Sequence, residues 1–227
     1  MRILALANTA DPETGYVGDA FVRRGAELVV AYREVGDFPP AVDDFDAVLS
    51  LGSESSVNDR HAVPVIGAEA ELLRRASSIG RPVLGLCFGA QLLAHALGGT
   101  VERSPSPELG WYTVESDVPE LIPTGPFVQW HYDRFTPPPG ARELARSASG
   151  SQAFVLGRNI GVQFHPEASA DVVRRWCKTG TAALARQGID GDAMIAESER
   201  QEASGHAQAR ADRVVETFLA GIPNEFG

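Results

Sequence analysis

Short apolar runs alternate with amphipathic stretches along the first hundred residues of the chain. The apolar runs, bounded by glycine, proline or polar residues, predict buried strands, and apolar positions three and four apart predict helices between them. Strands are expected at residues 2–8, 27–33, 45–51 and 82–86, and helices at 19–24, 67–79 and 90–97. This alternation is typical of an α/β protein with an open, mostly parallel twisted sheet and helices on both faces.

The pattern changes after residue 98. Proline and glycine are dense between residues 99 and 161, as in Pro137-Pro138-Pro139-Gly140, which predicts a small element of short antiparallel strands and turns. Residues 159–164 are expected to form one more short buried strand. Helices follow at 170–178 and in the polar stretch after residue 190. With no linker or internal repeat, we expect one domain over residues 1–227, with a C-terminal helical extension from about residue 168.

Composition narrows the function classes. Hydrophobic residues at 44% and charged residues at 22% are ordinary values for a globular enzyme. A formal net charge of −10 argues against nucleic acid or an anionic membrane as a partner, because both require a basic face. No apolar run reaches the ~18 residues of a membrane span, and the N-terminus has no signal-peptide pattern. With two cysteines and no disulfide framework, a cytoplasmic protein is expected.

The first candidate for chemistry is Cys87, which stands at the junction of a predicted strand and a predicted helix. Gly85 and Gly89 flank it two residues away on either side, and they allow the sharp turn of a nucleophile elbow. The N-terminus of the following helix would stabilise a thiolate and offer backbone N–H groups to an oxyanion. Cysteine is also a common core residue, so the elbow needs a base. Cys177, beside Trp176 in a helical stretch, is interpreted as a packing residue.

A base and an acid follow downstream in Gly161-Val162-Gln163-Phe164-His165-Pro166-Glu167. Alternate residues of an extended chain point the same way, so His165 and Glu167 can share one face, with the acid orienting the imidazole. Either residue alone would be interpreted as structural or solvated. Together with Cys87 they form the constellation of an activated nucleophile.

With these residues the chain resembles the class I (triad) glutamine amidotransferases, and most of all stand-alone proteins similar to the glutaminase domain of guanosine monophosphate synthetase. The elbow and residues 161–167 carry the resemblance, which runs over nearly the whole chain. Residues 50–59, 108–111 and 129–135 support it. It implies that Cys87, His165 and Glu167 are the catalytic triad.

The resemblance also implies an oxyanion hole made of backbone amides. One amide belongs to Phe88, which follows the nucleophile, and the other comes from the loop after the third predicted strand. That loop reads Gly52-Ser53-Glu54 here, whereas the family usually has Gly-Gly-Pro. The departure leaves Gly52 and Ser53 as alternatives for the second amide.

Three further residues gain a substrate-binding interpretation from the resemblance. Gln91 lies one helical turn after Cys87, where the family residue holds the amino-acid head of the substrate. His131 and Tyr132 lie in a segment that flanks the substrate pocket in the family. The other histidines, His61, His95 and His206, have no such context, and no spaced ligand set indicates a metal.

The implied reaction is hydrolysis of the glutamine side-chain amide to glutamate and ammonia. The sequence shows no phosphate-binding loop for ATP, so no cofactor is expected and a separate synthetase subunit would consume the ammonia. Two other functions stay open. One is a γ-glutamyl peptidase or hydrolase with the same triad and a wider pocket for other γ-glutamyl compounds. The other is a non-catalytic binding protein on the same fold.

Overall fold

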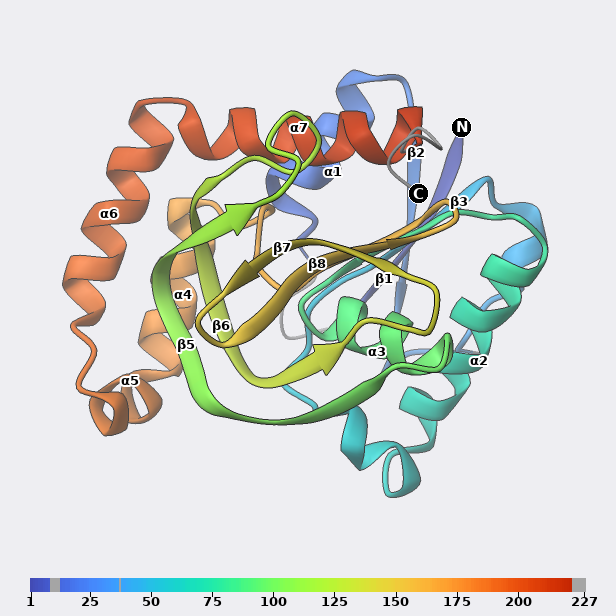
Figure 1. Ribbon diagram of the computed structural model, residues 1–227, viewed down its shortest axis with the longest axis horizontal. Coiled ribbons are helices and arrows are strands. Elements are labelled where there is room, and N and C mark those ends of the chain that lie inside the picture. Colours follow the sequence, from blue (N-terminus) through green and yellow to red (C-terminus); the bar gives the residue numbers. More distant parts are fainter. Residues whose placement is uncertain (9–12, 37, 222–227) are drawn as a thin grey trace.

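The parallel half of a nine-stranded sheet forms the N-terminal part of the fold in the computed structural model, which describes residues 1–8, 13–36 and 38–221 (Figure 1). Five neighbouring strands run parallel in the order β2-β1-β3-β4-β9. They are β1 (Arg2–Ala7), β2 (Glu27–Tyr32), β3 (Ala47–Ser50), β4 (Val83–Leu86) and β9 (Asn159–Val162). Each strand was predicted to within two residues at either end. The parallel α/β prediction is therefore confirmed.

The other half of the sheet is antiparallel and continues from β9 in the order β8-β7-β5-β6. These strands are β5 (Thr100–Ser116), β6 (Gly125–Thr136), β7 (Arg142–Ser147) and β8 (Gly150–Leu156). Two of them are much longer than predicted, with 17 residues in β5 and 12 in β6. The prolines of β5, Pro105 and Pro107, fall where its register with β6 shifts, between Arg103 and Glu108. A bulge tolerates residues without a backbone N–H, so these prolines do not end the strand.

Helices cover both faces of the parallel half. On one face, α1 (Gly15–Arg23) and α7 (His206–Ala220) pack together on the side chains of Ile3 and Ala5, with Phe21 and Phe218 edge to face at 5.9 Å. On the opposite face, α2 (Pro64–Ser78) and α3 (Phe88–Ala96) pack on Leu4 and Leu6. Successive residues of β1 thus alternate between two hydrophobic cores, as a strand covered on both faces requires.

The remaining helices form a separate layer beside β5 and β6. They are α4 (Ala170–Thr179), α5 (Thr181–Gln187) and α6 (Gly191–Ala203), which Figure 1 shows at the end of the molecule opposite α2. Their apolar residues form a third cluster with Leu109 and Val128 of the antiparallel strands. The interpretation of Cys177 as a packing residue is confirmed, because it is buried in this cluster and burial raises the pKa of its thiol.

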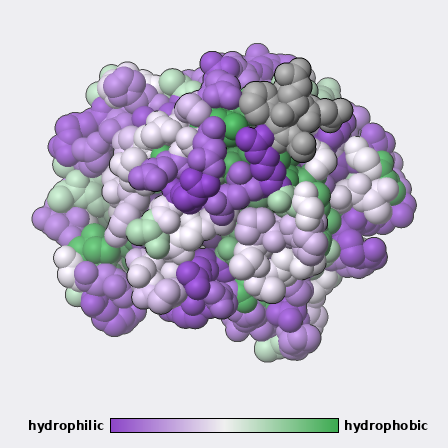
Figure 2. Space-filling model, in the orientation of Figure 1, coloured by the Kyte–Doolittle hydropathy of each residue, from purple (hydrophilic) through white to green (hydrophobic). Residues whose placement is uncertain are grey.

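The surface is largely polar. Figure 2 shows one face on which hydrophilic residues predominate and hydrophobic ones lie in small separate patches. Within the described residues, no helix is long and apolar enough to cross a membrane. Two short 3-10 turns complete the fold, Val42–Asp44 before β3 and Val57–His61 before α2.

Candidate active site

Cys87 occupies a sharp turn between β4 and α3. Its backbone has φ of +50° and ψ of −109°, a conformation that costs a non-glycine residue energy and that nucleophile elbows share. The two flanking glycines are required by close packing. A Cβ at Gly85 would lie 2.6 Å from the carbonyl oxygen of Gly89, and one at Gly89 would lie 2.0 Å from that of Ser50. The predicted elbow is therefore present.

His165 and Glu167 follow the end of β9, next to the elbow. The backbone N–H of Cys87 donates to the carbonyl of Val162 at 2.9 Å, which ties the elbow to this strand. His165 donates its own backbone N–H to Val128 of β6 at 2.9 Å. Its Nδ1 lies 2.7 Å from Oε1 of Glu167. The predicted pairing of imidazole and carboxylate is present in the structure.

The position of Glu167 depends on α1, which begins four residues earlier than the pattern predicts. The first turn of that helix packs on the backbone of Glu167. Tyr16 donates its N–H to the Glu167 carbonyl at 3.1 Å, and a Cβ at Gly15 would collide with the same oxygen at 1.9 Å. This tertiary contact explains the early helix start, because no local pattern encodes it.

The electrostatics of the site favour a charged imidazole. Cys87, His165 and Glu167 are 5%, 6% and 5% exposed. Burial alone would lower the pKa of His165, but the negative charges of Cys87 and Glu167 outweigh it and raise that pKa well above its usual value. His165 Nε2 is buried, forms no well-aligned hydrogen bond within the part of the chain that the structure describes, and lies in an imidazole close enough to Cys87 for that residue to raise its pKa. It is thus available for proton transfer.

The loop after β3 lies directly against these residues. A Cβ at Gly52 would lie 3.2 Å from Cε1 of His165 and 4.0 Å from Cβ of Cys87, so only glycine lets the loop approach this closely. Phe88, the first residue of α3, is buried beside Cys87. The structure therefore brings both predicted sources of oxyanion amides, the Gly52-Ser53 loop and Phe88, next to Cys87.

Gln91 is buried near Cys87. Its Nε2 donates to the carbonyl of Asp133 at 3.1 Å and to Oε1 of Gln163 at 3.2 Å. Gln163 in turn directs its Nε2 at Cys87 Sγ, at 3.7 Å. Gln163 is not among the site residues predicted from the sequence. Its place two residues before His165 on an extended segment, hence on the same face, is the signal that would have found it.

The side chains of the two other predicted substrate-binding residues contact protein groups in this structure. His131 lies in a buried polar network, with Nε2 3.1 Å from Glu108 Oε2 and Nδ1 3.0 Å from the carbonyl of Asp133. The half-buried Tyr132 packs under Arg103, whose guanidinium carbon is 4.5 Å from the ring centroid. Their segment approaches the thiol through its backbone, because the Trp130 carbonyl oxygen lies 3.9 Å from Cys87 Sγ.

An aromatic wall covers the imidazole on the side of the C-terminal helices. The ring of Trp176 on α4 meets that of His165 edge to face at 4.7 Å, and Trp130 packs on Trp176 at 5.9 Å. A Cβ at Gly180 would lie 2.5 Å from the Trp130 ring, so this glycine makes room for the wall. The contact between Trp176 and His165 is not predicted from the sequence, in which Trp176 is only a neighbour of Cys177.

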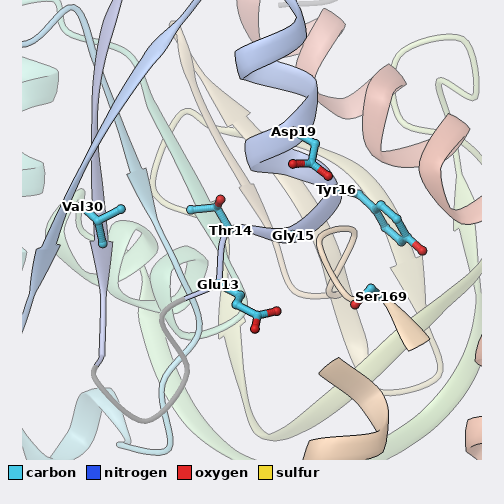
Figure 3. Close-up of a pocket in the computed structure, with 7 residues that line it drawn as sticks. All are labelled: Glu13, Thr14, Gly15, Tyr16, Asp19, Val30 and Ser169. Carbon is cyan, nitrogen blue, oxygen red and sulfur yellow. The ribbon is translucent and has the colours of Figure 1, made fainter. Parts of the chain in front are cut away.

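A separate surface pocket lies at the start of α1 (Figure 3). Its volume is about 390 Å³, and Figure 3 shows Glu13, Thr14 and Asp19 on one side of it and Tyr16 near Ser169 on the other. No predicted site residue lines it. The described residues also contain no cluster of three or more His, Cys, Asp or Glu side chains that could hold a metal. The elbow therefore remains the candidate site.

Comparison with known proteins identifies the family and supports the fold. The family model of the class-I glutamine amidotransferases matches residues 21–175. The chain belongs to this family. Its members are enzymes with a cysteine nucleophile. Two solved glutamine amidotransferases, from Thermotoga maritima and Methylobacillus flagellatus, superpose with TM-scores of 0.87 and 0.88 at 25% and 27% identity. They cover 97% and 98% of this chain, and the match covers 99% and 95% of theirs.

Several curated relatives of this chain are GMP synthases. The glutamine-hydrolyzing GMP synthase of Aeropyrum pernix is 42% identical over 128 residues, 53% of this chain and 23% of that protein. In Saccharolobus solfataricus, one subunit of the glutamine-hydrolyzing GMP synthase is 36% identical over 132 residues, 54% of this chain and 68% of that subunit. The chain thus spans less than a third of the first relatives' length but two thirds of a separate subunit.

Proposed function

We propose that this chain is a glutaminase that hydrolyses the side-chain amide of glutamine and passes the ammonia to a separate acceptor enzyme. The observation that carries the proposal is the position of Cys87, at positive φ before α3 and next to the hydrogen-bonded His165–Glu167 pair. Family membership supports the amidotransferase class.

The mechanism follows from the placement of these groups. The thiolate of Cys87 attacks the side-chain amide carbon of glutamine, and the backbone amides of Phe88 and of Gly52 or Ser53 stabilise the resulting oxyanion. The protonated His165, whose raised pKa keeps it charged, donates its proton to the departing ammonia. This leaves a γ-glutamyl thioester. His165 then takes a proton from the water that attacks the thioester, the carbon–sulfur bond breaks, and glutamate is released together with the Cys87 thiolate beside a protonated His165.

We assign recognition of the amino-acid head group to Gln91. Both hydrogens of its side-chain amide are engaged, but no described residue donates to its Oε1. An ammonium group supplies the donor that this oxygen lacks. The backbone at Trp130, near Cys87 Sγ, offers carbonyl oxygens to the same group. His131 and Tyr132 would contribute through the shape of this segment.

The acceptor enzyme is proposed to be a separate synthetase subunit. The support is that two curated relatives are each named as one subunit of a GMP synthase, and the chain matches 68% of each of them. In such an arrangement the two chains must dock so that ammonia reaches the acceptor without escaping to water.

The test is steady-state release of glutamate and ammonia from glutamine and from γ-glutamyl dipeptides. We expect turnover of glutamine, loss on the order of 10⁴-fold or more in Cys87→Ala, and wild-type activity in the matched control Cys177→Ala. A synthetase that co-purifies from the native source should increase the rate. Dipeptide cleavage with kcat/KM far above that for glutamine, with no retained partner, would replace this proposal with the γ-glutamyl peptidase.

A further inference from the structure

A fully buried ion pair lies beneath the loop that follows β3. Arg33, the residue after β2, pairs with Glu69 of α2, with Nε 2.5 Å from Oε2 and Nη2 3.0 Å from Oε1. The two side chains are 3% and 0% exposed. Ser50, the last residue of β3, donates its hydroxyl to the same carboxylate at 2.7 Å. Burying two charges is costly, and apolar residues often fill such a space equally well, so the pair calls for an explanation.

The guanidinium of Arg33 reaches beyond Glu69 to the loop itself. It donates to the carbonyl of Leu51 at 3.1 Å and to that of Gly52 at 3.3 Å. It also lies over the ring of Phe88, 5.1 Å from the centroid. Arg33 therefore contacts both segments that are expected to supply oxyanion amides. A guanidinium can do this because its planar fork offers five donors at fixed angles.

The contacts with Leu51 and Gly52 fix the direction of two amides. In a planar trans peptide the carbonyl oxygen and the following N–H point in opposite directions. Since the carbonyls of Leu51 and Gly52 both point to Arg33, the N–H groups of Gly52 and Ser53 both point away from it. The α-carbon of Gly52 lies against the triad, where an added Cβ would meet His165 Cε1 at 3.2 Å. The side of the loop opposite Arg33 is thus the side of Cys87.

We propose that Arg33, held in place by Glu69 and Ser50, is a positioning residue that keeps the loop amide, at Gly52 or Ser53, directed at the oxyanion. It does not touch substrate, and the inference rests on the proposed hydrolysis at Cys87. Without the guanidinium, the carbonyl of Leu51 loses the donor that orients its peptide, and the carbonyl of Gly52 keeps only the longer contact with Asn8 Nδ2 at 3.4 Å. The transition state then loses a preorganised donor, while ground-state binding of the substrate at Gln91 is unaffected.

The test uses the double variant Arg33→Met/Glu69→Met, which leaves no unpaired buried charge. We expect kcat for glutamine to fall on the order of 10²-fold, as when an oxyanion donor is removed, with KM nearly unchanged. Alkylation of Cys87 by iodoacetamide, which forms no oxyanion, should keep its wild-type rate. The matched control is Arg75→Met/Asp43→Met, an exposed pair that joins the same helix α2 to the turn before β3, and its kcat should not change.

A second variant protects the test against misfolding. Arg33→Lys keeps a charge opposite Glu69 but has no fork to reach the loop carbonyls, so kcat should again fall at an unchanged alkylation rate. Unchanged kcat in both variants, or an equal fall in kcat and alkylation, overturns the positioning role while wild-type turnover stands. A wild-type protein that hydrolyses neither glutamine nor γ-glutamyl dipeptides overturns the proposed function instead, and the inference with it.

Discussion

Replacement of Gly89 by alanine tests whether the elbow depends on close packing between α3 and β3. The residue is helical and not at positive φ, so alanine suits its backbone and by itself favours the helix by roughly 1 kcal/mol. The added Cβ would lie 2.0 Å from the carbonyl oxygen of Ser50 and 2.6 Å from its carbonyl carbon. Both are backbone atoms, so α3 and β3 must separate by about 1 Å to restore ordinary contact.

The expected cost follows from this displacement. Overpacking of a rigid core costs about 1–3 kcal/mol, which lowers the midpoint of thermal unfolding by about 2–12 °C in a chain of this size. Because Cys87 sits at the start of α3, the same shift moves the nucleophile, and a misplacement of about 1 Å reduces kcat on the order of 10²-fold. Circular dichroism on heating and glutamine turnover measure the two effects.

Gly67→Ala provides the matched control. Gly67 is also helical and not at positive φ, but the nearest atom to its added Cβ is the Arg60 carbonyl oxygen at 3.9 Å. This variant should be more stable than wild type by roughly 0.5–1 kcal/mol and fully active. If Gly89→Ala is as stable and as active as Gly67→Ala, the packing argument for the elbow is refuted.

Two further predictions concern the site. Glu167→Gln removes one of the negative charges that raise the pKa of His165, so that pKa should fall in an NMR titration. His165 then loses the proton that it donates to ammonia at a lower pH. The alkaline limb of the kcat–pH profile should therefore move to lower pH. An unshifted limb would contradict the role of Glu167. Ser53→Pro removes the Ser53 N–H but not that of Gly52, so a glutaminase assay decides between them: turnover within about tenfold of wild type assigns the oxyanion amide to Gly52, and a loss of about 10²–10³-fold assigns it to Ser53.

Local sequence patterns were sufficient for the parallel half of the sheet and for the elbow. Buried parallel strands appear as short apolar runs, and the helices between them as apolar residues three and four apart. The sharp turn at Cys87 can be predicted from the sequence because the glycines that permit it are only two residues away. His165 and Glu167 can be predicted as a pair because alternate residues of an extended segment share a face.

The roles of residues whose partners lie far away in the sequence could not be predicted from local patterns. Arg33 and Glu69 are 36 positions apart, and each alone resembles an ordinary solvated charge. His131 was expected at the substrate pocket, but its imidazole contacts Glu108, on a neighbouring strand whose register only the sheet defines. The length of β5 could not be predicted either, because the prolines that normally interrupt a strand lie where its register with β6 shifts.

The sequence by itself therefore determined which residues could carry out the chemistry, since a nucleophile, a base and a tight turn each leave a local signature. The tertiary structure decided how they are held. The loop at Gly52 contacts Cys87 and His165 only once β3, β4 and β9 pair side by side, and Glu167 is fixed only when α1 packs on its backbone. Such contacts depend on the summed packing of segments far apart in the chain, and no periodicity within one segment encodes them.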